Sequence, residues 1–201
     1  MSSQWQGFAH AVQSAALFMS SAKLDGDVIK TVQVRWDSER NVNIATATDR
    51  FMIGEQTFGG DTPPDPESWS TFLVGRDDVA TLVKNGDPTA VRVEDEKVTL
   101  TYPDGGSWSF VSVAGEYPAV SQLWDRAKAS GEVDHVLFNP ALLARLAKVT
   151  PYNDGKLGKR ATVLQRHGAT VRFEFQDPTL PARAHIGDRF RALIMPVREA
   201  A

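Results

Sequence analysis

The stretch STFLVGRDDVATLVKNG, residues 70–86, sets the pattern from which the fold can be predicted. Four of its first five residues are β-branched or apolar, and the five indicate a strand. The remainder predicts a short helix, because its apolar residues recur at helical spacing and Gly86 stands where glycine commonly ends a helix. The apolar positions of this helix are Val79, Leu82 and Val83.

Three further strands are predicted after this helix. They are TAVRVE (89–94), KVTLTY (97–102) and SWSFVSV (107–113). The segment Pro103–Gly106, Pro-Asp-Gly-Gly, separates the last two and is typical of a hairpin turn, since glycine readily adopts the positive φ of tight turns. The pattern is therefore one β-α-β-β-β unit.

Two other parts of the chain repeat this unit. The first copy has a helix over 7–22, with Phe8, Val12, Ala15 and Met19 at helical spacing, and strands over 31–36, 41–48 and 51–58. The third has a lead strand over 135–138, a helix over 139–149 and strands over 162–166, 170–175 and 191–197. Asn139 and Pro140 are favourable residues for the start of that helix. Polar connectors, residues 59–69 and 124–134, separate the copies.

This repetition predicts an α+β fold with antiparallel sheets and few, short helices. We expect a domain over residues 1–124, made of two halves at 1–60 and 69–124, and a half-domain over 132–201. The lead strand of the first half is missing or confined to its first few residues.

The amino-acid composition excludes some classes of protein. The chain has 201 residues, no cysteine and a formal net charge of −3. These values argue against a disulfide framework, a thiolate metal site and a protein that coats DNA through overall basicity, but they allow a local basic surface. Neither a signal peptide nor an apolar run of about 20 residues is visible, so we expect a soluble cytoplasmic protein without membrane contact.

Catalytic patterns are weak. The four histidines are scattered, without metal-ligand spacing, and there is no phosphate-binding loop or nucleophile elbow. Asp49 in TATDRF could act as a catalytic acid or base, but no partner for it can be named. We therefore predict a protein that is not an enzyme and needs no metal or other cofactor, with an Asp49-based enzyme as the minority alternative.

Four segments resemble, in order, the bacterial DNA sliding clamp, the β subunit of DNA polymerase III. They are ATDRFMIGE (47–55), VAGEYPAVSQLW (113–124), LFNPALLARLAKV (137–149) and ALIMPVR (192–198). The chain departs from the family at Arg50, where the family turn has glycine, and at Met52 and Ile53, where it has a basic residue and leucine. It is also short, resembling the second domain of the family plus the last half of the third.

The resemblance implies a processivity factor that encircles double-stranded DNA and binds peptides of polymerases and clamp loaders in a hydrophobic pocket. By position, that pocket corresponds to Thr48, Arg50, Phe51, Met52, Ile53, Pro118, Leu123, Ile194, Met195, Pro196, Val197 and Arg198. Methionine suits such a pocket because its side chain adapts to varied partners. The alternative at Ile194 and Met195 is ordinary core packing.

A clamp holds DNA through basic residues on the helices that line its hole, contacting phosphates without reading sequence. Basic residues on the exposed side of the second and third helices, and in one loop, are the candidates: Arg76, Lys84, Arg145, Lys148, Lys156, Lys159 and Arg160. An ordinary solvated helix face explains the helix residues equally well.

The number of units suggests how a ring could form. A closed ring of the family contains about twelve half-domains, so four copies of this chain would complete one, as a homo-oligomer whose subunits pair their sheet edges head to tail. A short clamp of this kind suggests a phage-like origin. The alternative function is a clamp-derived binding module, an adaptor or decoy for clamp-binding peptides, that forms no ring.

Overall fold

The computed structural model describes residues 4–59, 69–127, 136–150 and 170–197. Its elements in chain order are α1 (Phe8–Ala16), the 3₁₀ helix η1 (Asp27–Lys30), β1 (Thr31–Asp37), β2 (Val42–Thr48), β3 (Met52–Phe58), β4 (Phe72–Gly75), α2 (Arg76–Asn85), β5 (Ala90–Glu94), β6 (Lys97–Thr101), β7 (Ser107–Val111), α3 (Ser121–Arg126), α4 (Pro140–Leu146), β8 (Val171–Glu174), β9 (Ala182–Ile186) and β10 (Phe190–Ile194).

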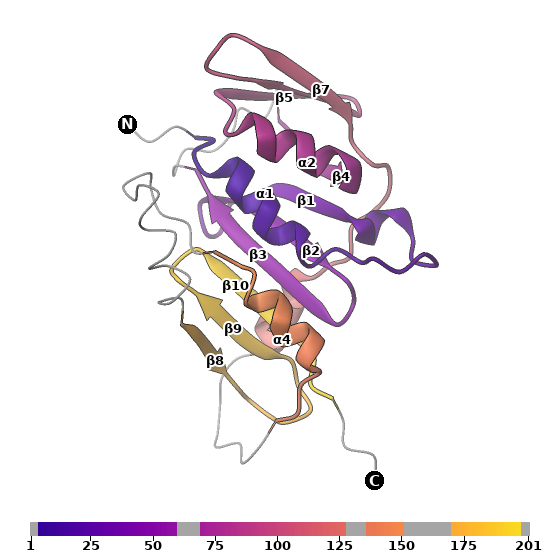
Figure 1. Cartoon of the computed structure of the whole chain (residues 1–201), viewed down its shortest axis with the longest axis vertical. Coiled ribbons are helices and arrows are strands. Elements are labelled where there is room, and N and C mark those ends of the chain that lie inside the picture. Colours follow the sequence, from indigo (N-terminus) through magenta and orange to yellow (C-terminus); the bar gives the residue numbers. More distant parts are fainter. Residues whose placement is uncertain (1–3, 60–68, 128–135, 151–169, 198–201) are drawn as a thin grey trace.

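Two antiparallel sheets organise these strands (Figure 1). One has seven strands in the order β4-β1-β2-β3-β10-β9-β8, and the other has three in the order β5-β6-β7. The larger sheet joins the first and third predicted units through β3 and β10, with Ile53 opposite Leu193. The lead strand of the second unit, β4, pairs with β1 of the first. The α+β class with antiparallel sheets and short helices is confirmed.

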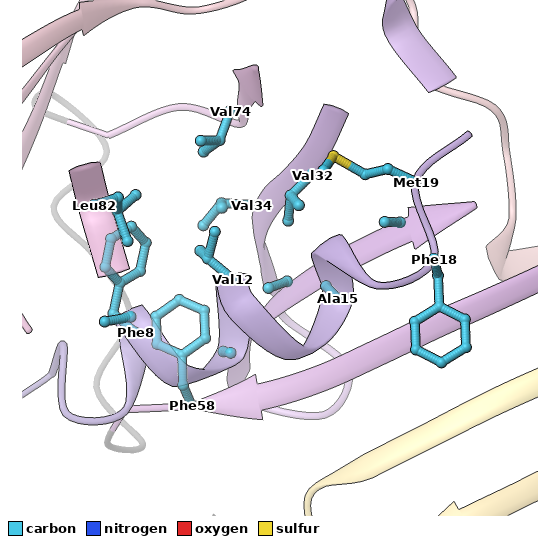
Figure 2. Packing of buried hydrophobic residues seen from close by; sticks show 14 of the residues in the cluster. Phe8, Val12, Ala15, Phe18, Met19, Val32, Val34, Phe58, Val74 and Leu82 are labelled. Carbon is cyan, nitrogen blue, oxygen red and sulfur yellow. The ribbon is translucent and has the colours of Figure 1, made fainter. Parts of the chain in front are cut away.

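The main core lies between α1, α2 and the sheets. Figure 2 shows Phe8 of α1 beside Leu82 of α2 and Phe58 of β3, and the rings of Phe8 and Phe58 are 5.4 Å apart. Phe8, Val12 and Ala15 of α1 are fully buried, as their helical spacing predicts. Burial of a side chain such as Phe8 or Val12 contributes about 1.5–3 kcal/mol.

A second apolar cluster packs around residues 117–127, the segment that leads into α3. It contains Tyr117, Val120, Trp124 and Ala127, together with Ile53, Leu73 and Leu193 of the large sheet. Strand alternation explains the division, because Met52 and Ile194 belong to the main core whereas their neighbours Ile53 and Leu193 belong to the second cluster.

The structure corrects three predicted elements and adds two that were not predicted. Residues 136–138 form no strand: the Leu137 carbonyl accepts one backbone bond, from Val197, and no ladder follows. The α1 helix ends at Ala16 and α4 at Leu146, both earlier than predicted. Sequence reasoning missed β9 and α3 altogether. The strand predicted over 162–166 lies outside the described residues.

Candidate binding cavity and basic helix faces

An apolar cavity opens where three distant segments meet. These are the turn between β2 and β3, the segment that enters α3, and the end of β10. The cavity has a volume of about 190 Å³. Its lining residues are Ile29, Thr48, Arg50, Phe51, Met52, Ile53, Pro118, Val120, Leu123, Pro181, Leu193 and Met195. The pairing of β3 with β10 holds the first and last of these segments side by side.

Most of the residues assigned to the pocket from the sequence line this cavity. They are Thr48, Arg50, Phe51, Met52, Ile53, Pro118, Leu123 and Met195. Ile194 is instead fully buried in the main core, while Pro196 and Val197 continue beyond the lining. Arg198 lies outside the described residues.

Sequence reasoning missed four lining residues: Ile29, Val120, Pro181 and Leu193. Leu193 could have been found, because alternate residues of a strand share a face and Met195 already faces the cavity. Ile29 and Pro181 carry no such signal, since they come from η1 and from the loop before β9.

The turn between β2 and β3 is held by its own side chains. One carboxylate oxygen of Asp49 accepts hydrogen bonds from the backbone N–H groups of Phe51 and Met52, at 3.0 and 2.8 Å. The Thr48 hydroxyl donates to the Met52 carbonyl at 2.8 Å. Arg50 adopts a left-handed backbone with φ 76°. The result is a fixed turn that leaves the Phe51 side chain 63% exposed at the cavity.

Asp49 is fully engaged by this scaffold. Its second carboxylate oxygen accepts a hydrogen bond from the Arg145 guanidinium of α4. This ion pair connects α4 to the turn between β2 and β3, so the Arg145 side chain is already bound within the protein. Nothing in the geometry of Asp49 favours acid or base catalysis, which requires reach to a reacting proton.

A buried ion cluster supports the strands behind the cavity. The Glu55 side chain is fully buried on β3, and its Oε2 accepts a hydrogen bond from Nε of Arg191 of β10 at 2.7 Å and forms an ion pair with Nη2 of the same guanidinium at 2.5 Å. Arg35 and Arg40 lie 3.7 and 3.5 Å away. Arg191 also stacks 3.9 Å above the Trp124 ring. The cluster therefore links the β3–β10 junction to α3 through charge and cation–π contact.

Tyr117 completes this support. Its hydroxyl donates to the Thr46 carbonyl at 3.3 Å. Burial, with a smaller contribution from the Glu55 charge, raises the pKa of Tyr117 far above its ordinary value. The phenol therefore stays a proton donor, and this hydrogen bond holds the segment that leads to Pro118 against β2.

The cavity can bind apolar groups next to a polar rim. Its floor and walls are aliphatic or aromatic. Met195 of the lining adds exposed apolar surface, as do Val197, two residues further along the chain, and Leu137, whose carbonyl accepts from the Val197 N–H. At the rim, Arg50 is 63% exposed and forms an ion pair with Asp25 at 2.9 Å. Such a surface suits a short peptide with apolar side chains, because apolar area supplies affinity and a few polar groups fix orientation.

Helices α1, α2 and α4 lie on the same side of the large sheet (Figure 1). Arg76, Ala80 and Lys84 are exposed along α2, as their spacing predicts. Arg76 donates to the Ser20 carbonyl at 2.7 Å. Lys148 follows the end of α4 and is exposed. Lys156, Lys159 and Arg160 lie outside the described residues.

The part of the chain that the structure describes holds no group of three or more side chains suited to a metal ion. No described helix is long and apolar enough to cross a membrane.

The fold matches solved structures over nearly the whole chain. A protein described as a DNA polymerase III β subunit from Eubacterium rectale aligns with TM-score 0.69 and 12% identity, covering 98% of this chain and 64% of its own. The chain has the fold of the bacterial DNA sliding clamp. The clamps from Bartonella birtlesii and Pseudomonas aeruginosa, both solved bound to griselimycin, align with TM-scores 0.65 and 0.64 and 13% and 14% identity; each match covers 99% of this chain and 65% of the clamp.

The likeness is one of fold. The chain spans 64–65% of the length of these clamps. No family model matches the sequence, and no curated protein matches it.

Proposed function

We propose that this protein is a DNA sliding clamp, a processivity factor that encircles double-stranded DNA and binds peptides of a DNA polymerase and a clamp loader. One observation carries the proposal: on a clamp fold, the three segments predicted to form a peptide pocket enclose one apolar cavity. The protein is not an enzyme in this proposal, and the domains over 1–124 and 132–201 remain its predicted divisions.

The helix side of the sheet is the proposed DNA surface. Arg76, Lys84 and Lys148 expose positive charge there while the chain as a whole is acidic, with a net charge of −3. Lysine and arginine side chains attract phosphates without sequence preference, which suits a protein that must slide. Arg145 contributes less, because it is bound to Asp49.

Retention on circular DNA tests the ring. The protein is loaded onto nicked circular DNA, separated from free protein by gel filtration, and the DNA is then linearised. A closed ring stays on the circle and leaves the linear form, since topology holds it in place. Equal retention on both forms, or none on either, contradicts a topological clamp.

The cavity is tested with griselimycin as the probe, because two structures with this fold contain it. We expect calorimetric binding to the unmodified protein and at least a tenfold loss of affinity in Met195→Arg, which places a charge at the cavity. Leu143→Arg on α4 is the matched control, because both side chains are 37% exposed. Equal losses in both variants contradict the cavity assignment.

A binding module without a ring is the second candidate. The observation that favours it is the length of the chain, which spans only 64–65% of the clamps compared above. This candidate predicts griselimycin binding and loss of binding in Met195→Arg, but no difference between circular and linear DNA.

A further inference from the structure

The edge strand β7 carries the features of an interface with a second copy of this chain. The smaller sheet ends at β7, and no strand of the described residues lies beyond it. Its partner β6 bonds to the even-numbered positions: Gly106 accepts from Tyr102 at 2.9 Å and Ser112 donates to Glu96 at 2.7 Å. In an antiparallel ladder the intervening residues, among them Ser109, therefore direct their N–H and C=O groups to the open edge.

Edge strands are commonly protected by charges, proline or a covering segment, because a bare edge pairs with another chain. The other edges here are protected. The outward faces of β5 and β8 carry ion pairs, Arg92 with Glu94 at 2.8 Å and Arg172 with Glu174 at 2.9 Å. The edge of β4 is covered at Leu73, which is hydrogen-bonded to residues 112 and 113. In contrast, β7 reads SWSFV, without charge or proline, and its Val111 is 64% exposed.

The chain also contains a precedent for the contact. In the first and third units the last strands, β3 and β10, pair antiparallel and fuse two units into one sheet. The last strand of the second unit is β7, which has no such partner among the described residues. A second copy can supply it, because its own β7 is in the same position.

We propose that β7 pairs antiparallel with β7 of a second copy about a two-fold axis at Ser109. This register places Trp108 opposite the partner's Phe110. The core-facing aromatic residues of both strands then lie on the same face of the joined sheet. A slip by one residue would set Trp108 against an exposed serine and is disfavoured. The inference deepens the proposed ring, on which its biological role rests, and changes its symmetry: one contact between copies is head to head.

The axis position allows a charge-exchange test. Ser109 is exposed on the outer face of the sheet, where its hydroxyl forms a hydrogen bond with that of Thr99 at 2.9 Å, so lysine and aspartate are accommodated there. In a two-fold contact each variant places two like charges opposite each other. We expect Ser109→Lys and Ser109→Asp each to raise the dimer dissociation constant about tenfold or more, and a 1:1 mixture to restore association.

Sedimentation velocity without DNA, over protein concentrations up to the high micromolar range, measures this association, because a short strand pair is a small interface. Circular dichroism confirms that each variant is folded. Arg172→Glu on β8 is the control and should associate like the unmodified chain. The proposal is overturned if the unmodified chain stays monomeric, if the Ser109 variants associate normally, if their mixture gains nothing, or if only Arg172→Glu dissociates, which would place the second copy on β8.

Cross-linking gives an independent readout. The chain has no cysteine, so Ser109→Cys introduces a single thiol. A short bis-maleimide should link two copies through it, and an Arg172→Cys variant should give much less dimer. Failure of this contact leaves the cavity and its griselimycin test untouched. Conversely, the chain could cross-link at position 109 but show no topological retention on DNA. That result would contradict the proposed clamp and support the β7 contact.

Discussion

At the scale of single residues, Arg50 shows how one backbone conformation shapes the cavity. Its φ of 76° is unfavourable for a side chain with a Cβ atom and is the conformation that glycine adopts freely. Arg50→Gly and Arg50→Ala both remove the ion pair with Asp25, but only the glycine relieves the backbone. We expect the glycine variant to be more stable than the alanine variant by about 0.5–1 kcal/mol in urea unfolding. Equal stabilities would show that the turn relaxes.

Glu55 supports a second prediction at this scale. Its buried carboxylate faces Arg35, Arg40 and Arg191, so Glu55→Gln leaves three guanidinium groups without their counter-charge. We expect a loss of about 3–5 kcal/mol in the free energy of unfolding, measured by urea titration. Glu94→Gln breaks only an exposed pair and should cost less than about 1 kcal/mol. Comparable losses would mean that the cluster adds nothing beyond surface charge.

The residues of the site were predictable where they sit in a local motif. Thr48 to Ile53 belong to one turn whose sequence resembles that of the clamp family, so their place at the cavity could be inferred from that resemblance. The role of Glu55 could not be recognised from the sequence, because its arginine partners are 15 to 136 positions away in the chain. A buried charge cluster depends on strand pairing, which the sequence does not state.

At the scale of elements, α1 depends on a cap from another unit. The Asp87 carboxylate, which follows α2, accepts hydrogen bonds from the N–H groups of Gly7 and Ala9 at 2.7 and 2.9 Å. Asp87→Ala removes the partners of both donors, so we expect a loss of about 1–2 kcal/mol in thermal or urea unfolding. Asp104→Ala, which affects only a hairpin turn, should cost less. A loss no greater in Asp87→Ala would contradict the role of this cap.

His10 makes the packing of α1 sensitive to pH. Its Nε2 lies 2.9 Å from the Thr150 carbonyl, and burial lowers its pKa below the ordinary value, against smaller opposing contributions from Thr150 and Asp87. Because the unfolded chain binds the proton more readily, this contribution to stability is present above about pH 6.5 and is lost as the pH falls below that value.

The matching experiment compares urea unfolding at pH 7.5 and pH 5.5. The unmodified chain should lose more stability on acidification than His10→Gln, since glutamine does not titrate. His185→Gln is made for comparison with His10→Gln, because burial also lowers the pKa of His185, with Glu174 opposing the shift. The two variants together show how much of the pH dependence each histidine contributes. Identical pH dependence in His10→Gln and the unmodified chain would contradict the assignment to His10.

Elements were predictable in proportion to their local signal. Strands rich in valine, isoleucine and threonine, such as β1 and β6, follow from composition and alternation. The strand β9 was missed because its buried positions include the small residues Ala182 and Ala184, which carry little strand preference. The helix α3 has six residues and its packing depends on the distant Arg191, so its periodicity was too short to detect.

At the scale of the whole molecule, the sequence predicts three units but does not predict how they join. The second unit joins the first through the pairing of β4 with β1, and the third unit joins the first through the pairing of β10 with β3. Both contacts connect residues that are far apart in the chain. Alternation predicts which face of a strand is buried, but it does not identify the strand that lies alongside.

The basic side of the helices gives the last prediction. Lys84 and Lys148 are exposed on the side of the large sheet that α1, α2 and α4 cover, so in the proposed clamp both would contact phosphates of the encircled duplex. In the double variant Lys84→Glu/Lys148→Glu, we expect weaker binding to a short duplex and a slope of log affinity against log salt that is smaller by roughly 2 per copy. Fluorescence anisotropy over a salt series measures both quantities.

The control has the same change of net charge at other positions. Lys23→Glu/Lys97→Glu replaces two exposed lysines, one in the loop after α1 and one on the smaller sheet. Attraction that depends on net charge alone lowers affinity equally in both double variants. Direct phosphate contact by the helix side instead changes the salt slope only in Lys84→Glu/Lys148→Glu, because only contacts that release counterions enter that slope. Equal slopes in the two variants would therefore move the DNA to another surface of the molecule.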